Sequence, residues 1–142
     1  MRVIMIVIFL ILTGCAIEPE PISYGKDMCH FCSMTIVDDQ HASEMVTSKG
    51  RAYKYDAIEC MINDIANNDY GEISLLLVSD YSNPGALVNV DKSIFLVSQS
   101  IPSPMGAYLS AFSVKDDAEK KRTDGEDQIY SWDEIKSKLA QN

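Results

Sequence analysis

An apolar segment at the N-terminus determines which part of this chain can belong to the folded domain. Arg2 is followed by an uncharged, mostly apolar run over residues 3–12, and the run leads into Leu12-Thr13-Gly14-Cys15. This order is typical of a bacterial secretory signal, which is too short to cross a membrane as a folded helix and is removed after export. We therefore expect residues 1–14 to be a lipoprotein signal peptide, which leaves 128 residues to fold outside the cytoplasm.

Cys15 occupies the cysteine position of a lipobox, where the thiol takes a diacylglycerol and the chain is cut just before it. Acyl chains contribute about 0.8 kcal/mol per buried methylene, so two or three of them hold a protein on a bilayer. We expect Cys15 to be a lipid anchor in the cell envelope and not a metal ligand. Residues 15–26, with Glu18-Pro19-Glu20-Pro21 in their middle, are predicted to be an extended tether.

The predicted mature chain is strongly acidic. Without Arg2, eleven basic residues oppose twenty-one acidic ones, which gives a net charge of −10. Such a charge argues against nucleic acid or anionic lipid headgroups as partners. The hydrophobic content of 46% supports a packed core, and 128 residues suffice for one compact domain or two small halves packed together.

Hydrophobic patterning predicts an α+β fold built from two ββαβ-type halves. In the first half, residues 27–82, we expect a hairpin of two strands, a helix that begins near Ile58 with Asp56 as its N-cap, and a central strand. The three expected strands cover residues 42–47, 52–55 and 73–78.

The second half, residues 83–142, has a similar order of expected elements. Its strands are expected at residues 87–90, 94–98, 108–112 and 128–130, and a polar helix at 115–122. Ser131-Trp132-Asp133-Glu134 has the pattern of a capping box, which predicts a last helix. The repeated order suggests an internal duplication.

Soft metal ligands are concentrated in Met28-Cys29-His30-Phe31-Cys32-Ser33-Met34. These seven residues hold two thiols, two thioethers and one imidazole, more than core packing usually requires. Thiolate and thioether donors select copper(I), a soft cation with little geometric demand. Zinc sites rarely use thioethers, so Met28 and Met34 favour copper(I) over zinc.

The Cys-x-x-Cys pair has other possible explanations. Ser33 directly follows Cys32, and this excludes attachment of c-type haem, which needs a histidine there. A thioredoxin-like pair needs a helix after the second cysteine, whereas Thr35-Ile36-Val37 has an extended pattern. Three alternatives stay open: a lipid-anchored thiol-disulfide oxidoreductase, a zinc-binding protein that uses Cys29, Cys32, Cys60 and one histidine, and a plain disulfide or buried thiol pair.

Three short motifs together match a known family pattern. They are the lipobox Cys15, Cys32-Ser33-Met34 and, late in the chain, Pro104-Met105-Gly106. In this order they resemble the NosL family of copper chaperone lipoproteins, and the resemblance extends over nearly the whole mature chain. It implies a fold of two ββαβ halves, copper(I) as the metal, and delivery to nitrous oxide reductase, whose copper-sulfide centre is built outside the cytoplasm.

The resemblance also implies a set of metal ligands. Cys32, Met34 and Met105 correspond to the family motifs, and Cys29 and Met28 extend the first of them. A site that includes both Cys32 and Met105 would lie at the junction of the two halves. No serine-histidine-acid set, phosphate loop or paired-carboxylate pattern indicates an enzyme, so we expect a binding and delivery protein without catalytic residues.

Overall fold

The computed structural model describes residues 17–140 of the chain. The predicted signal peptide and Cys15 lie outside the described residues. In chain order the elements are β1 (Ser43–Thr47), β2 (Ala52–Tyr55), α1 (Ile58–Asn67), β3 (Ile73–Asp80), β4 (Asn83–Asn89), the short 3-10 helix η1 (Val90–Lys92), β5 (Ile94–Val97), β6 (Leu109–Phe112), α2 (Lys115–Lys121), β7 (Gln128–Tyr130) and α3 (Trp132–Leu139). The predicted α+β class is confirmed, and each expected strand and helix is present within a few residues of its predicted bounds.

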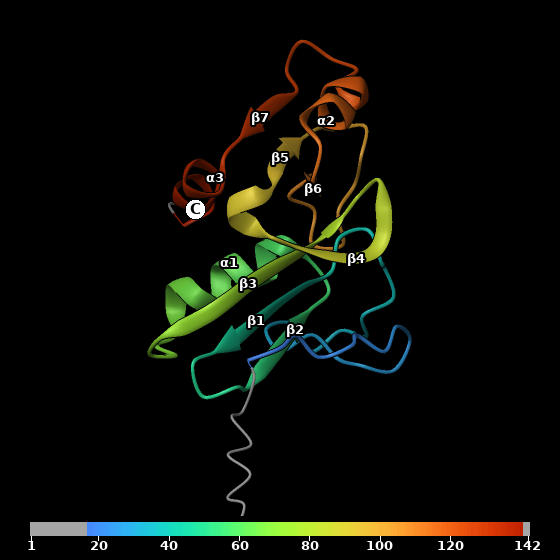
Figure 1. Ribbon diagram of the computed structural model, residues 1–142. Helices are drawn as coiled ribbons and strands as arrows, with labels where there is room; N and C mark the ends of the chain where they lie inside the picture. The colour runs from blue at the N-terminus through green and yellow to red at the C-terminus, as the bar shows by residue number, and fades with distance from the viewer. Residues whose placement is uncertain (1–16, 141–142) are drawn as a thin grey trace, which may run out of the picture.

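Seven strands form one sheet with the order β2-β1-β3-β6-β5-β7, and β4 pairs with β3 beside this path. The two halves of the sheet meet through a single parallel pair, Asp80 with Ala111. Figure 1 shows β1, β2, β3 and α1 in the lower part of the molecule and β5, β6, β7, α2 and α3 in the upper part. The order ββαβ therefore occurs twice, while an internal duplication stays a prediction.

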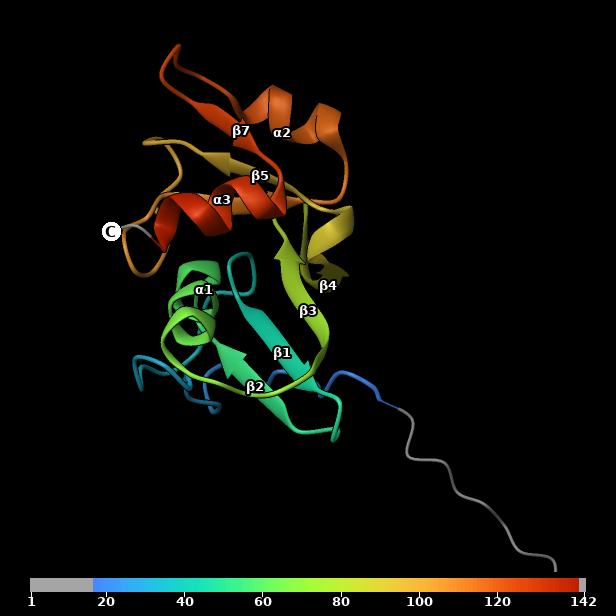
Figure 2. The same cartoon turned by 90° about the vertical axis from the view of Figure 1, so that its left-hand side faces the viewer.

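One hydrophobic core spans both halves. Figure 2 shows α1 and α3 next to each other across the junction of the halves, and the two helices are in contact. Ile58 and Met61 of α1 belong to the same buried cluster as Phe95 of β5 and Trp132 of α3. Phe95 and Trp132 pack with ring centroids 5.6 Å apart, so Trp132 anchors the last helix as an aromatic core residue. The two parts cannot separate without exposing this shared core.

The helix ends test two capping predictions. Ser131 and Glu134 form the predicted capping box at the start of α3, each side chain bonding to the backbone of the other residue. At α1 the prediction is wrong, because Ala57 occupies the N-cap position and has no side-chain capping bond. Asp56 lies one residue earlier, and its carboxylate accepts a hydrogen bond from a thiol instead.

The predicted tether contacts the domain from Glu20 onward. The Glu20 N–H donates to Glu44 Oε1 at 2.7 Å, and Lys54 pairs with Asp27 at 2.9 Å. Glu44 is fully buried, and this burial raises the pKa of its carboxyl. The segment before β1 is thus held against β1 and β2.

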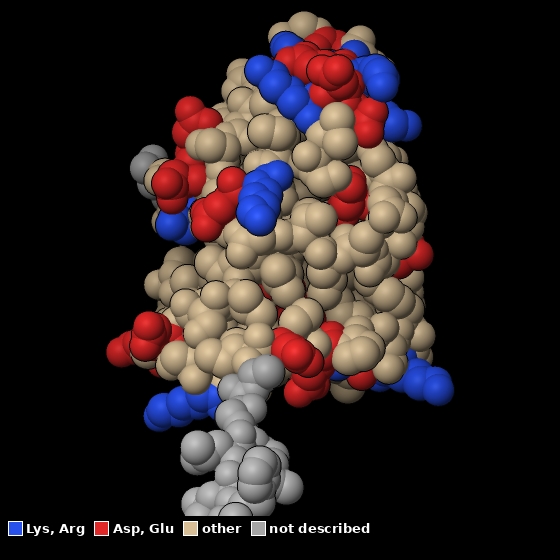
Figure 3. Space-filling model, viewed as in Figure 1, with Lys and Arg blue, Asp and Glu red and all other residues tan. Residues whose placement is uncertain are grey.

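The charged surface agrees with the acidic composition. On the face shown in Figure 3, acidic and basic side chains gather together at the top of the view, around α2, at mid-height on its left and near the bottom, and uncharged side chains cover most of the area between them. Basic side chains on this face are interleaved with acidic ones and form no continuous patch. No helix within the described residues is both long and apolar enough to cross a membrane.

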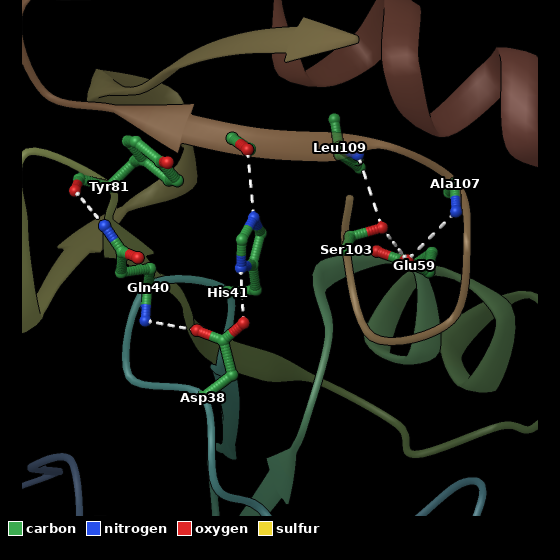
Figure 4. Close-up of polar contacts among 9 residues, drawn as sticks. Asp38, Gln40, His41, Glu59, Tyr81, Ser103, Ala107 and Leu109 are labelled. Atoms are coloured by element: carbon green, nitrogen blue, oxygen red, sulfur yellow. Dashed lines mark hydrogen bonds and ion pairs between the residues drawn. The ribbon is translucent and has the colours of Figure 1, made fainter. Parts of the chain in front are cut away.

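A buried polar bridge connects the two halves beside the shared core. His41 Nδ1 lies 2.8 Å from Asp38 Oδ2, and His41 Nε2 lies 3.0 Å from Ser110 Oγ on β6. Figure 4 shows His41 between Asp38 and that strand. An acid, a histidine and a serine are in line here, but the serine is fully buried and cannot reach a substrate. The bridge is therefore structural.

We expect His41→Ala to lower the free energy of unfolding by more than about 2 kcal/mol, because it leaves the buried Ser110 hydroxyl unpaired, removes the contact with half-buried Asp38 and opens a cavity. Ser110→Ala removes one of the two contacts and is expected to cost about 1 kcal/mol. Urea denaturation followed by circular dichroism measures both. Equal losses for the two variants would show that the His41 bridge contributes nothing beyond the Ser110 contact.

Candidate metal site

Three cysteines from two separate segments meet at the start of α1. Cys29 and Cys32 come from the loop before β1, and Cys60 lies in the first turn of α1. Together with Asp56, they form a group in which the four ligand atoms all lie within 4.8 Å of one another. Cys29, Asp56 and Cys60 are buried and Cys32 is half-buried, so the group has its most accessible side at Cys32.

Backbone hydrogen bonds close the cysteine loop and turn its thiols inward. The Cys29 N–H donates to the Met34 carbonyl at 2.8 Å, and the Ser33 N–H donates back to the Cys29 carbonyl at 2.9 Å. Ser33 has a φ of 62°, a left-handed conformation that reverses the chain after Cys32. The His30 N–H donates to the Lys54 carbonyl at 2.8 Å and fixes the loop to β2. These backbone hydrogen bonds therefore fix the positions of Cys29 and Cys32.

Asp56 reaches the group because it follows β2 directly. Its Oδ1 accepts a hydrogen bond from the Cys32 thiol at 3.4 Å. Asp56 lies just before the N-cap Ala57 of α1, and Cys60 lies in the first turn of that helix. No local sequence signal indicated Asp56 as a member of the site.

The three thiols differ in acidity. The pKa of Cys29 is lowered to about 6, mainly because the Cys60 thiol donates a hydrogen bond to it. The same hydrogen bond raises the pKa of Cys60, and burial raises the pKa of Cys32 to about 11. At neutral pH the group thus holds one thiolate, at Cys29, and two thiols. A metal ion that binds all three sulfurs must displace two protons.

The predicted thioether ligands lie on the surface. Met28 is 60% exposed, Met34 52% and Met105 44%. Met28 and Met34 flank the cysteine loop in sequence, whereas Met105 lies in the segment between β5 and β6. Of the predicted thiol ligands, the structure brings together Cys29 and Cys32, and Cys60 and Asp56 lie with them. The three thioether ligands stay a prediction.

Neither histidine belongs to the group. His30 points to the aromatic rings of Tyr53 and Tyr70, and its Nε2 lies 3.1 Å from the Tyr70 hydroxyl. His41 is part of the buried bridge between the halves. Asp56 therefore takes the place that the zinc alternative had given to a histidine.

The donor set fits two kinds of metal. Three thiols suit copper(I), which forms strong bonds to two or three sulfurs and leaves the harder carboxylate aside. Three thiols and a carboxylate also suit tetrahedral zinc. The arrangement of these four donors suits both copper(I) and zinc, so the protein family decides which ion is proposed.

Comparisons with known proteins agree on one family. A family model described as NosL matches residues 22–140 of the chain. Among solved structures, the chain is similar to the copper chaperone NosL from Shewanella denitrificans, with 23% identity, a TM-score of 0.72, and coverage of 84% of this chain and 96% of that one. At this identity the likeness shows a shared fold. No curated protein sequence matches the chain.

We expect the metal-free protein to show a thiolate absorbance step near pH 6, the pKa of Cys29, in an ultraviolet titration. Because the folded pKa lies below the usual value, the thiolate is present above this pH and is lost as the pH falls through it. Cys29→Ser should remove the step. Cys60→Ala should move it to higher pH, because the donor is gone, whereas Cys60→Ser keeps a donor and should leave it near its original place. A step that is insensitive to Cys60→Ala would contradict this assignment.

Proposed function

This chain belongs to the NosL family, and on that premise we propose that it is an extracytoplasmic chaperone that binds copper(I) and delivers it for assembly of the copper-sulfide centre of nitrous oxide reductase. The observation that carries the proposal is the convergence of three thiols within 4.8 Å in a chain that matches the family over residues 22–140. The family is not one of enzymes, which confirms the expectation that the chain has no catalytic activity.

Copper(I) would be held mainly by sulfur. Cys29 already carries a negative charge at neutral pH, so it supplies the first thiolate. Cys32 and Cys60 lie within 4.8 Å of it and complete a two- or three-sulfur site after losing their protons. We propose Cys29, Cys32 and Cys60 as the thiol ligands, and Cys60 is the addition that the sequence pattern alone did not include.

The exposed thioethers suit entry and exit of the ion. Cys32 is the half-buried member of the thiol group, so the ion is expected to pass there between the group and solvent or a partner protein. Met28, Met34 and Met105 are neutral donors on the surface. A neutral thioether binds copper(I) without adding charge and releases it more readily than a thiolate does. In this proposal Met34 and Met105 complete the copper sphere and yield when a recipient supplies its own ligands, and Met28 is an accessory donor.

The lipid anchor is a separate part of the proposal. Leu12-Thr13-Gly14-Cys15 lies outside the described residues, and its support is the sequence pattern. An acylated Cys15 would tie the domain to a membrane surface of the cell envelope, with only a short spacer before Glu20, whose N–H is bonded to Glu44. The domain would then work close to the bilayer.

The test of the copper proposal is a metal competition under reducing conditions. We expect the full-length chain to retain one copper(I) per molecule in the presence of an equal amount of zinc, because three sulfurs favour the softer ion. Cys32→Ser should abolish tight copper(I) binding, since it removes a thiolate, and Met34→Leu should weaken it while preserving the fold. Affinity is measured by competition with a colorimetric copper(I) chelator.

A matched control is available in β1, a strand without cysteine. Met45→Leu alters a buried methionine of that strand, so it should leave copper affinity unchanged. Zinc retained as well as copper would overturn the copper proposal and support the zinc alternative with Cys29, Cys32, Cys60 and Asp56. If the protein binds neither metal and instead forms a Cys29–Cys32 disulfide that reductants open, the result would support the oxidoreductase alternative.

The lipoprotein proposal has its own test. We expect Cys15→Ala to abolish both cleavage after Gly14 and attachment to the membrane, because the thiol is the acceptor of the diacylglycerol. Fractionation of cells that express the full-length chain shows the location, and mass spectrometry of the purified protein shows the modification. An unmodified Cys15, or cleavage at another position, would contradict the assignment.

A further inference from the structure

We propose that Glu59 is a positioning residue, which holds the loop of Met105 against the first turn of α1 so that this thioether and the thiol group can act on the same ion. The Met105 loop is defined here as residues 103–107. The inference rests on the proposed copper-binding function and assigns a role to a buried carboxylate that is not itself a member of the four-donor group.

The contacts of Glu59 are specific to this loop. Glu59 is 3% exposed, and its Oε1 accepts hydrogen bonds from the Ser103 hydroxyl at 2.5 Å and from the Ala107 N–H at 3.3 Å. Ser103 Oγ also accepts the Leu109 N–H at 3.4 Å. In Figure 4 the loop curves around the start of α1, with the Glu59 carboxylate between its two limbs. One carboxylate oxygen thus closes both ends of the loop.

The loop needs such support because its backbone is bent sharply. The Gly106 N–H donates to the Ser103 carbonyl at 3.0 Å, which places Met105 inside a tight turn. Gly106 has a φ of 80°, and Tyr108 follows with a φ of 56°. A left-handed conformation is unfavourable for a residue with a side chain, so Tyr108 adopts it only because surrounding contacts hold it there.

The arrangement of Glu59 costs stability that a simple loop anchor would not require. Its second oxygen, Oε2, is buried and has no hydrogen-bond partner among the described residues. A buried acceptor without a hydrogen-bond partner lowers the stability of the folded protein. A carboxylate at this place is therefore better explained by its position at the site than by stability alone.

Glu59 connects the two parts of the proposed copper site through one helical turn. It directly precedes Cys60 in the first turn of α1, and Asp56 lies just before that turn. The start of α1 thus carries two members of the four-donor group and the anchor of the Met105 loop. Met105 is two residues from each anchored position, Ser103 and Ala107. Any shift of the loop relative to α1 moves its thioether relative to the thiols.

The test is a double-mutant cycle on copper(I) affinity, measured on the full-length chain by competition with a colorimetric chelator. We expect Glu59→Ala to lower the affinity by about tenfold to a hundredfold, the range that orienting partners of metal ligands usually control. Met105→Leu should cause a similar loss, and the double variant should lose no more than the worse single variant, because both changes remove the same thioether from the ion. Glu59→Gln keeps an oxygen acceptor and should restore most of the affinity.

His41→Ala is the matched control, since it breaks the other buried bridge between the halves without touching the Met105 loop. It should destabilise the fold and leave copper affinity unchanged. If Glu59→Ala does not fold, Ser103→Ala removes the shorter of the two loop contacts and carries the same test.

Additive losses in the cycle, wild-type affinity in Glu59→Ala, or an equal loss in His41→Ala would each overturn the positioning role. If Met105→Leu keeps full affinity while Cys32→Ser loses it, the inference is wrong and the copper proposal stands. If Cys32→Ser also keeps full affinity, the proposed function itself fails.

Discussion

Burial of one face of α1 against both halves of the molecule is the constraint on which the site depends. Ile58, Met61 and Ile62 are fully buried in a cluster that also contains Phe95 and Ile135 from the second half. Each such side chain contributes roughly 1.5–3 kcal/mol when it leaves water, so the position of α1 is strongly fixed. Asp56 lies just before this helix, and its first turn carries Glu59 and Cys60. The chemistry is therefore attached to the best-packed element of the fold.

Polar groups at the start of α1 are arranged to suit a cation. The turn and the adjacent loop bring together the Cys29 thiolate and the Asp56 carboxylate in a group that can hold a metal. Buried anions without an opposite charge are unfavourable, and hydrogen bonds from Cys60 and Cys32 offset part of this cost in the metal-free protein. Because those hydrogen bonds use the protons that copper(I) would displace, the apo site is partly prepared for the ion while staying stable without it.

The sequence predicted the fold well and the site only in part, for identifiable reasons. Strands such as β7 and helices such as α3 follow from local alternation and from the Ser131–Glu134 capping box, which depend on neighbouring residues. Cys29 and Cys32 were found because they are close in the chain. Cys60 was named as a zinc ligand but not for copper, since its approach depends on how α1 packs. Asp56 was assigned to the helix cap, and nothing in a local pattern distinguishes a capping carboxylate from one that accepts a thiol proton.

The thiols are buried and the thioethers are exposed, so the donors differ between the inside and the surface of the proposed site. The buried sulfurs of Cys29 and Cys60 are shielded from solvent, and both would be charged in a metal complex, so they favour retention of the ion. The exposed sulfurs of Met34 and Met105 are neutral and accessible to another protein. Under the proposed function, an ion that moves outward past half-buried Cys32 would exchange charged donors for neutral ones, and each exchange would weaken its binding while opening a coordination position. Release can therefore proceed by stepwise ligand exchange at the surface, without unfolding the shared core that holds α1 in place.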